Sequence, residues 1–106
     1  MRKANPKIEI FYFAGCPNYE PTVNLAREVL GELGLEAEVL EVAVETLDDA
    51  EAQRFVGSPS VRVNGKDIEP GAEDRRDFAL SCRMYGTGGV PPKELLIEAL
   101  QEALWR

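Results

Sequence analysis

The sequence contains no histidine. This absence excludes catalysis in which a histidine activates a serine or a cysteine, and it excludes the usual histidine-containing zinc sites. Any nucleophile in this chain must therefore be activated by helix geometry or by a neighbouring lysine or arginine. We assign no metal-binding residues to the sequence.

Cysteine is scarce as well, since only Cys16 and Cys82 are present. No secretory signal is recognisable, because the first apolar run is interrupted at Glu9 and reaches Gly15 after a few residues. No segment is long enough to cross a bilayer. We therefore expect a cytoplasmic protein without membrane contact, in which cysteines are more often chemical or buried than structural disulfides.

Positive charge is also in short supply. Lysine and arginine number 12, aspartate and glutamate number 19, and the net charge is −7. A nucleic acid or an anionic membrane demands a basic surface, so neither is an expected partner. The length of 106 residues predicts one domain, which we place at residues 7–105.

Apolar periodicity predicts alternating strands and helices. A strand-helix-strand beginning implies a right-handed crossover and parallel strands, and Asn64-Gly65 predicts the tight turn of an antiparallel hairpin. One or two helical turns are expected between Asp74 and Met84. The predicted strands are 7–13, 36–43, 60–63 and 66–69, and the predicted helices are 18–33, a short helix after Thr46 or Asp48 that ends near Gly57, and 92–105.

One cysteine follows the first strand directly, in Gly15-Cys16-Pro17-Asn18-Tyr19. A thiol at the start of a helix lies beside unpaired backbone N–H groups and the positive end of the helix dipole. Both favour the thiolate, which is the reactive form of cysteine. Cys16 is therefore the candidate nucleophile, and the alternative is a small buried apolar residue.

This order of elements, with the Cys16 turn after the first strand and Ser58-Pro59-Ser60 before the hairpin, resembles the thioredoxin fold. The resemblance implies an α/β protein of order β-α-β-α-β-β-α, with a central mixed four-stranded sheet flanked by helices. The hairpin is most similar to that of glutaredoxins. The chain also looks like a small family of bacterial thioredoxin-like proteins that carry one cysteine or selenocysteine in this turn. Some members of that family accompany mercury-resistance or thiol-redox proteins.

The resemblance implies that Pro59 is cis and faces Cys16. Ser58 and Pro59 would then shape a groove for an extended peptide or glutathione. The Tyr19 hydroxyl is a candidate hydrogen-bond donor to a thiolate or substrate, and the alternative is a packing residue. Arg83, and more weakly Arg62, are candidates for stabilising a thiolate, against the alternative of a solvated surface arginine.

The sequence departs from thioredoxins at Tyr19, which stands where the second cysteine of the turn belongs. Dithiol exchange within this turn is therefore excluded, and a single-thiol glutaredoxin-like mechanism is left. The second strand of the hairpin returns toward the end of the sheet that carries Cys16. We therefore expect Cys82, in the following segment, to lie close enough to Cys16 to form a disulfide, the alternative being a core residue.

Three functions follow from these residues. The first is a thiol-disulfide oxidoreductase, with Cys16 as nucleophile and Cys82 as resolving thiol; its partner is a thiol or disulfide protein or glutathione, with no other cofactor. The second is a soft-metal protein in which two thiolates bind Hg(II) or Cu(I). The third is a binding module without chemistry, for which Trp105 is a candidate dimer contact.

Overall fold

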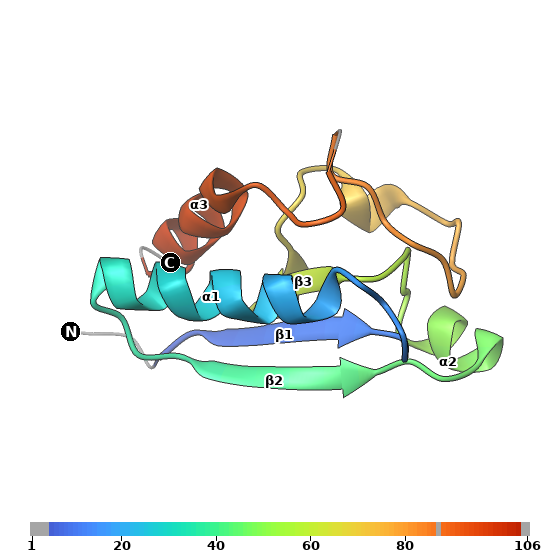
Figure 1. Ribbon diagram of the computed structural model, residues 1–106. Helices are drawn as coiled ribbons and strands as arrows, with labels where there is room; N and C mark the ends of the chain where they lie inside the picture. Colours follow the sequence, from blue (N-terminus) through green and yellow to red (C-terminus); the bar gives the residue numbers. More distant parts are fainter. Residues whose placement is uncertain (1–4, 87, 105–106) are drawn as a thin grey trace.

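The computed structural model describes residues 5–86 and 88–104. The strands and helices follow the predicted order, with one additional 3₁₀ turn, η1, after the hairpin (Figure 1). Trp105 lies outside the described residues. The elements are β1 (Lys7–Tyr12), α1 (Tyr19–Leu33), β2 (Glu38–Ala43), α2 (Leu47–Ala52), β3 (Ser60–Val63), β4 (Lys66–Asp67), η1 (Ala72–Asp74) and α3 (Lys93–Leu104).

The four strands form one mixed sheet in the order β2-β1-β3-β4. Strands β1 and β2 are parallel, whereas β1 and β3 are antiparallel and pair Ile10 with Val61. Asn64 and Gly65 both have positive φ, at 52° and 86°, as the predicted two-residue hairpin turn requires. The α/β fold class expected from the sequence is confirmed.

Strand β4 is shorter than the predicted strand 66–69. The Asp67 carboxylate accepts a hydrogen bond of 2.9 Å from the Glu69 N–H. This local turn removes that N–H from the sheet and ends the strand after Asp67.

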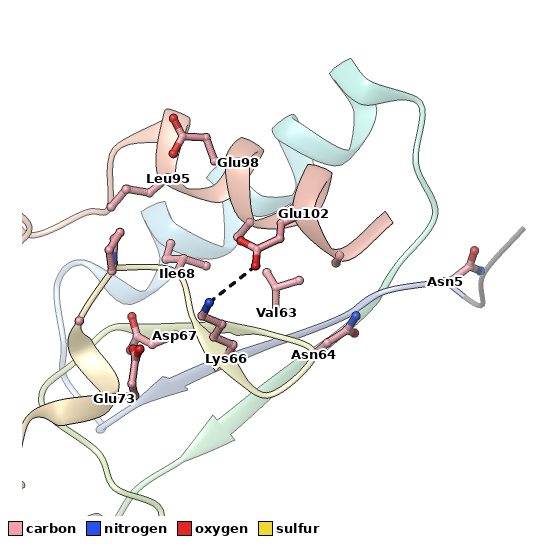
Figure 2. A pocket seen from close by; sticks show the side chains of 14 residues that line it. Asn5, Val63, Asn64, Lys66, Asp67, Ile68, Glu73, Leu95, Glu98 and Glu102 are labelled. Carbon is pink, nitrogen blue, oxygen red and sulfur yellow. Dashed lines mark ion pairs between the residues drawn. The ribbon is translucent and has the colours of Figure 1, made fainter. Parts of the chain in front are cut away.

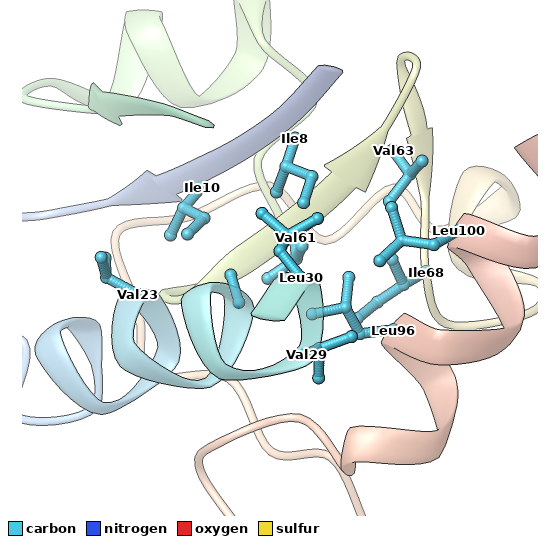
Figure 3. Packing of buried hydrophobic residues seen from close by; sticks show 11 residues of the cluster. Ile8, Ile10, Val23, Val29, Leu30, Val61, Val63, Ile68, Leu96 and Leu100 are labelled. Atoms are coloured by element: carbon cyan, nitrogen blue, oxygen red, sulfur yellow. The ribbon is translucent and has the colours of Figure 1, made fainter. Parts of the chain in front are cut away.

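Helices α1 and α3 cover one face of the sheet (Figure 1). Their apolar stripes meet the inward side chains of β1 and β3 in the main core, where the helices and strands converge (Figure 3). A smaller cluster on the second face joins β1 to the region of α2. The main core contains Ile8, Ile10, Val23, Ala26, Val29, Leu30, Val61, Val63, Ile68, Leu96 and Leu100, and the smaller cluster contains Phe11, Val44, Ala50 and Phe55.

Helix α1 begins after Cys16 in the chain. Its N-cap is Asn18, and Pro21 falls in the first turn, where the missing N–H removes no helical hydrogen bond. Its C-cap is Gly34, with φ of 63° and its N–H directed to the carbonyls of Leu30 and Gly31.

Gly31 offers a stability test within α1. A Cβ added there meets no atom of the described residues within 4 Å, so alanine fits without a clash. We expect Gly31→Ala to raise the free energy of unfolding by about 0.5–1 kcal/mol, because alanine loses less backbone entropy in a helix than glycine does. Urea unfolding measures the change. Gly34→Ala, at a positive φ, is expected to lower stability, and a loss in Gly31→Ala would show that the α1 packing is wrong.

The prediction of helical turns between Asp74 and Met84 is wrong for the residues that follow η1. After Arg75 the chain runs in an irregular, extended path, and the Ala79 N–H donates to the Phe55 carbonyl at 3.1 Å. Backbone groups of this segment bond across to distant residues, so the local bonds of a helix do not form.

No helix in the described residues is long and apolar enough to cross a membrane.

Candidate functional site

Cys16 lies in a tight turn at the end of β1. Its N–H donates to the Phe13 carbonyl at 3.2 Å, and its carbonyl accepts a hydrogen bond from the Tyr19 N–H at 3.4 Å. Gly15 precedes it with a φ of 88°, a conformation that favours glycine. The residue is 9% exposed. Cys16 thus precedes the N-terminus of α1, as the sequence predicts, although it lies outside the helix itself.

The Ser58–Pro59 peptide bond, just before β3, is cis. This is the isomer that the resemblance to thioredoxins implies. Strand pairing matches Phe11 of β1 with Ser60 of β3, and the next step of this antiparallel register sets Tyr12 opposite Pro59. The Ser58–Pro59 loop and the turn after β1 are therefore at the same end of the sheet.

Cys82 is paired directly with the Ser58–Pro59 loop. The Ser58 N–H donates to the Ser81 carbonyl at 2.8 Å, and the Arg83 N–H donates to the Ser58 carbonyl at 2.9 Å. These bonds form an isolated parallel bridge between Ser58 and Cys82, and Cys82 is exposed. The residue before Pro59 thus has both backbone polar groups bound by the chain's own Cys82 segment.

Arg83 anchors this segment in the protein interior. It is 2% exposed, and its guanidinium donates to Ser60 Oγ at 2.9 Å and to both Asp67 carboxylate oxygens at 2.8 and 2.9 Å. A fourth bond of 2.9 Å reaches Glu69 Oε1. Burial by itself lowers the pKa of Arg83, but the carboxylates raise it above the ordinary value. The surface alternative for Arg83 is therefore wrong, and its substrate contact stays a prediction.

Tyr85 adds a second anchor that the sequence reading did not single out. Its hydroxyl donates to the Pro59 carbonyl at 2.6 Å, and its ring lies 4.6 Å from the Arg83 Cζ. Burial raises the pKa of this phenol above its ordinary value, so the hydroxyl stays protonated and donates. The sequence offered one indication of this role. Tyr85 follows Arg83 by two residues, and alternate residues of an extended segment point to the same side.

Two glycines mark close approaches of the Cys82 segment to the rest of the site. A Cβ on Gly57 would lie 2.9 Å from the Arg83 Cβ. A Cβ on Gly89 would lie 2.2 Å from the Asn18 Nδ2, on the turn that carries Cys16. The chain that begins at Cys82 therefore contacts the Ser58–Pro59 loop first and the Cys16 turn afterwards.

The contact between Gly89 and Asn18 can be tested by a double-mutant cycle. We expect Gly89→Ala to cost about 1 kcal/mol or less, because the added methyl group displaces the end of the half-buried Asn18 side chain. Asn18→Ala should cost little, since that side chain makes no capping hydrogen bond to α1. The double variant should recover most of the loss in chemical denaturation. Additive losses would show that the two residues do not touch.

Tyr19 is bound by its neighbours. Its ring stacks on Tyr12 with centroids 3.8 Å apart and planes 10° apart, and its hydroxyl donates to the Glu41 carboxylate. This hydrogen bond raises the pKa of Tyr19 above its ordinary range. The hydroxyl is therefore occupied by Glu41, which agrees with the packing alternative, and its bond to a thiolate or substrate stays a prediction.

Both cysteines are free thiols in the structure. The Ser58 hydroxyl beside Cys82 is buried and has no hydrogen-bond partner among the residues that the structure describes. Within residues 5–86 and 88–104, no three or more cysteine, aspartate or glutamate side chains gather as a metal-ligand group. The two-thiolate metal site proposed from the sequence would need fewer ligands, so it stays a prediction.

A groove of about 790 Å³ lies between the β3–β4 hairpin and α3. Figure 2 shows Lys66 and Glu102 as an ion pair across it, at 3.7 Å, with Glu98 at its edge. Neither cysteine lines this groove. The two cysteines instead lie in the loops at the other end of the sheet.

Comparison with known proteins establishes the fold. The solved structure of a selenoprotein W-related protein from Vibrio cholerae is similar to this chain, with a TM-score of 0.55 and 19% sequence identity. The match covers 95% of this chain and 99% of that chain. No protein-family model and no curated protein matches the sequence. A likeness at this identity shows the thioredoxin-like fold alone.

Proposed function

We propose that this protein is a cytoplasmic thiol-disulfide oxidoreductase in which Cys16 and Cys82 form a reversible redox pair. The observation that carries the proposal is the backbone bridge between Cys82 and Ser58, directly before cis Pro59. The contact between Gly89 and Asn18 supports it, because it brings the same segment to the Cys16 turn. A thioredoxin-like fold is compatible with this chemistry and does not by itself assign it.

The proposed reaction has two exchange steps. The Cys16 thiolate attacks one sulfur of a disulfide substrate, which breaks the substrate S–S bond, forms a mixed disulfide and releases the first thiol. The Cys82 thiolate then attacks the Cys16 sulfur, which releases the second thiol and leaves a Cys16–Cys82 disulfide. The substrate gains two electrons and the protein loses two. A thiol protein would donate two electrons and return the Cys16–Cys82 disulfide to the reduced form by the same kind of exchange.

The contacts of Ser58 favour a small substrate over an extended polypeptide. A peptide that adds to a sheet edge needs free backbone N–H and C=O groups. Both groups of Ser58 are already bound to Ser81 and Arg83, and the Arg83 side chain fixes that segment through buried ion pairs. A polypeptide would have to displace this segment. Of the two partners expected from the sequence, glutathione disulfide is therefore the better candidate.

Mass spectrometry of the protein treated with glutathione disulfide tests the proposal. The parent protein should release two glutathione molecules and hold an internal disulfide. Cys82→Ser should instead accumulate one glutathione on Cys16, because the resolving thiol is missing. Cys16→Ser should form no internal disulfide. Glutathione retained equally by the parent and Cys82→Ser would overturn the resolving role of Cys82.

A further inference from the structure

A second hollow lies beside the β3–β4 hairpin and is rich in positive charge. Its volume is about 360 Å³, near the lower size of small-molecule sites. Four cationic side chains line it against two acidic ones, although the whole chain carries a net charge of −7. The cations are Arg54, Arg62, Lys66 and Arg75, and the acids are Asp67 and Glu73.

The carboxylate of Asp67 does not neutralise these cations fully. Both of its oxygens accept hydrogen bonds from the buried Arg83 guanidinium. Within the described ranges, neither Arg54 nor Arg62 takes part in an ion pair. Two guanidinium groups thus line the hollow with no carboxylate of the described part of the chain within ion-pair distance.

Aromatic and backbone contacts hold these two arginines in place. The Arg62 guanidinium lies 4.2 Å from the Phe11 ring centroid and donates to the carbonyls of Gln53 and Arg54. The Arg54 guanidinium lies 5.2 Å from the Phe78 ring centroid. Burial lowers the pKa of Arg62, the nearby carboxylates of Asp67 and Glu9 oppose this shift, and the positive charges of Arg83 and Arg54 add to it more weakly. A bound anion would further stabilise this partly buried cation.

The backbone of Arg54 has a conformation that is unusual for a residue with a side chain. It has a φ of 56° and follows Gln53, the C-cap of α2. Glycine or asparagine usually occupies this left-handed position, because a side chain there is unfavourable. Arg54 thus places a long cationic side chain at a position that usually holds glycine, in the lining of a hollow rich in cations. Such departures from local sequence preference are common at functional sites.

We propose that this hollow binds a small molecule carrying two anionic oxygen groups, carboxylate or phosphate, joined to an apolar portion. Arg54 and Arg62 would bind the anionic groups, since a guanidinium offers paired donors to such oxygens. Val56, Ala72 and Phe78 would contact the apolar portion. The site does not include either cysteine, so it is independent of the proposed redox pair.

NMR titration of the reduced full chain tests this site. Pyrophosphate and phthalate serve as the phosphate and carboxylate probes, and sodium chloride at matched ionic strength is the salt control. At least one probe should give saturable shifts at Arg54, Arg62 and Phe78 that chloride does not reproduce. If only one of the two probes saturates, the site prefers the anionic group of that probe, phosphate or carboxylate. Shifts that do not saturate, or that equal those of chloride, would overturn the site.

The variant Arg54→Gly separates binding from folding. Glycine suits the positive φ, so the thermal midpoint should not fall. Binding of the effective probe should nevertheless weaken by about tenfold or more, because one charged hydrogen-bond donor is lost. Arg27→Gln, which removes an exposed charge of α1, is the matched control and should leave binding unchanged. Equal weakening in both variants would show a general charge effect and refute the site.

Discussion

Replacing Arg83 with methionine is expected to lower the free energy of unfolding by about 3–5 kcal/mol, because it leaves buried carboxylates without their counter-ion. The Arg83 side chain is completely buried, and that of Asp67 is only 10% exposed. Methionine retains much of the side-chain volume, so the loss reports mainly on charge and hydrogen bonds. Guanidinium unfolding of the reduced protein measures it.

Arg75 provides the matched control for Arg83. Its side chain also pairs with an aspartate, Asp77, but the two side chains are 35% and 63% exposed. Exposed ion pairs contribute little, so Arg75→Met should change stability by no more than about 1 kcal/mol. Similar losses in the two variants would contradict the buried anchoring of the Cys82 segment.

The variant Gly57→Ala is expected to cost about 2–4 kcal/mol. Its φ of 130° is strained for any residue with a side chain, and the new methyl group would meet the Arg83 Cβ at 2.9 Å and Cα at 3.2 Å. Because the clash involves backbone that is bound to Ser58, no side-chain rotation relieves it. Thermal unfolding measures the loss.

Gly65→Ala separates the two contributions to this loss. Gly65 has a positive φ of 86°, but a Cβ there meets nothing within 4 Å. It should therefore show the conformational cost alone, about 1–2 kcal/mol. If Gly57→Ala loses no more than Gly65→Ala, the close approach of Arg83 to Gly57 is refuted.

Local patterns were sufficient to predict most of the fold. The stripe of α1, the cap of α2 and the Asn64-Gly65 turn each depend on neighbours in sequence, and Thr46 is the cap of the two candidates, Thr46 and Asp48. The Thr46 hydroxyl accepts a hydrogen bond from the Asp49 N–H at 3.0 Å, as an N-cap does. The parallel pairing of β1 with β2 was expected from the crossover rule, and the antiparallel pairing of β3 with β4 from the hairpin turn.

The anchoring of the Cys82 segment could not be predicted in the same way. Its bonds join Arg83 to Asp67, 16 residues earlier, and Tyr85 to Pro59, 26 residues earlier. No local period encodes such pairs, and a helix was predicted where the chain is extended. Arginine side chains are usually exposed, so the burial of Arg83 could be recognised only once the positions of its carboxylate partners were known.

The central claim is that Cys16 and Cys82 react with each other, and non-reducing peptide mapping of the oxidised protein tests it most directly. After oxidation by glutathione disulfide at low protein concentration, we predict one peptide pair that joins Cys16 to Cys82 within a single chain. The pair should disappear in both Cys16→Ser and Cys82→Ser. A product in which Cys16 and Cys82 carry separate glutathione molecules, with no joined peptide, would contradict the account.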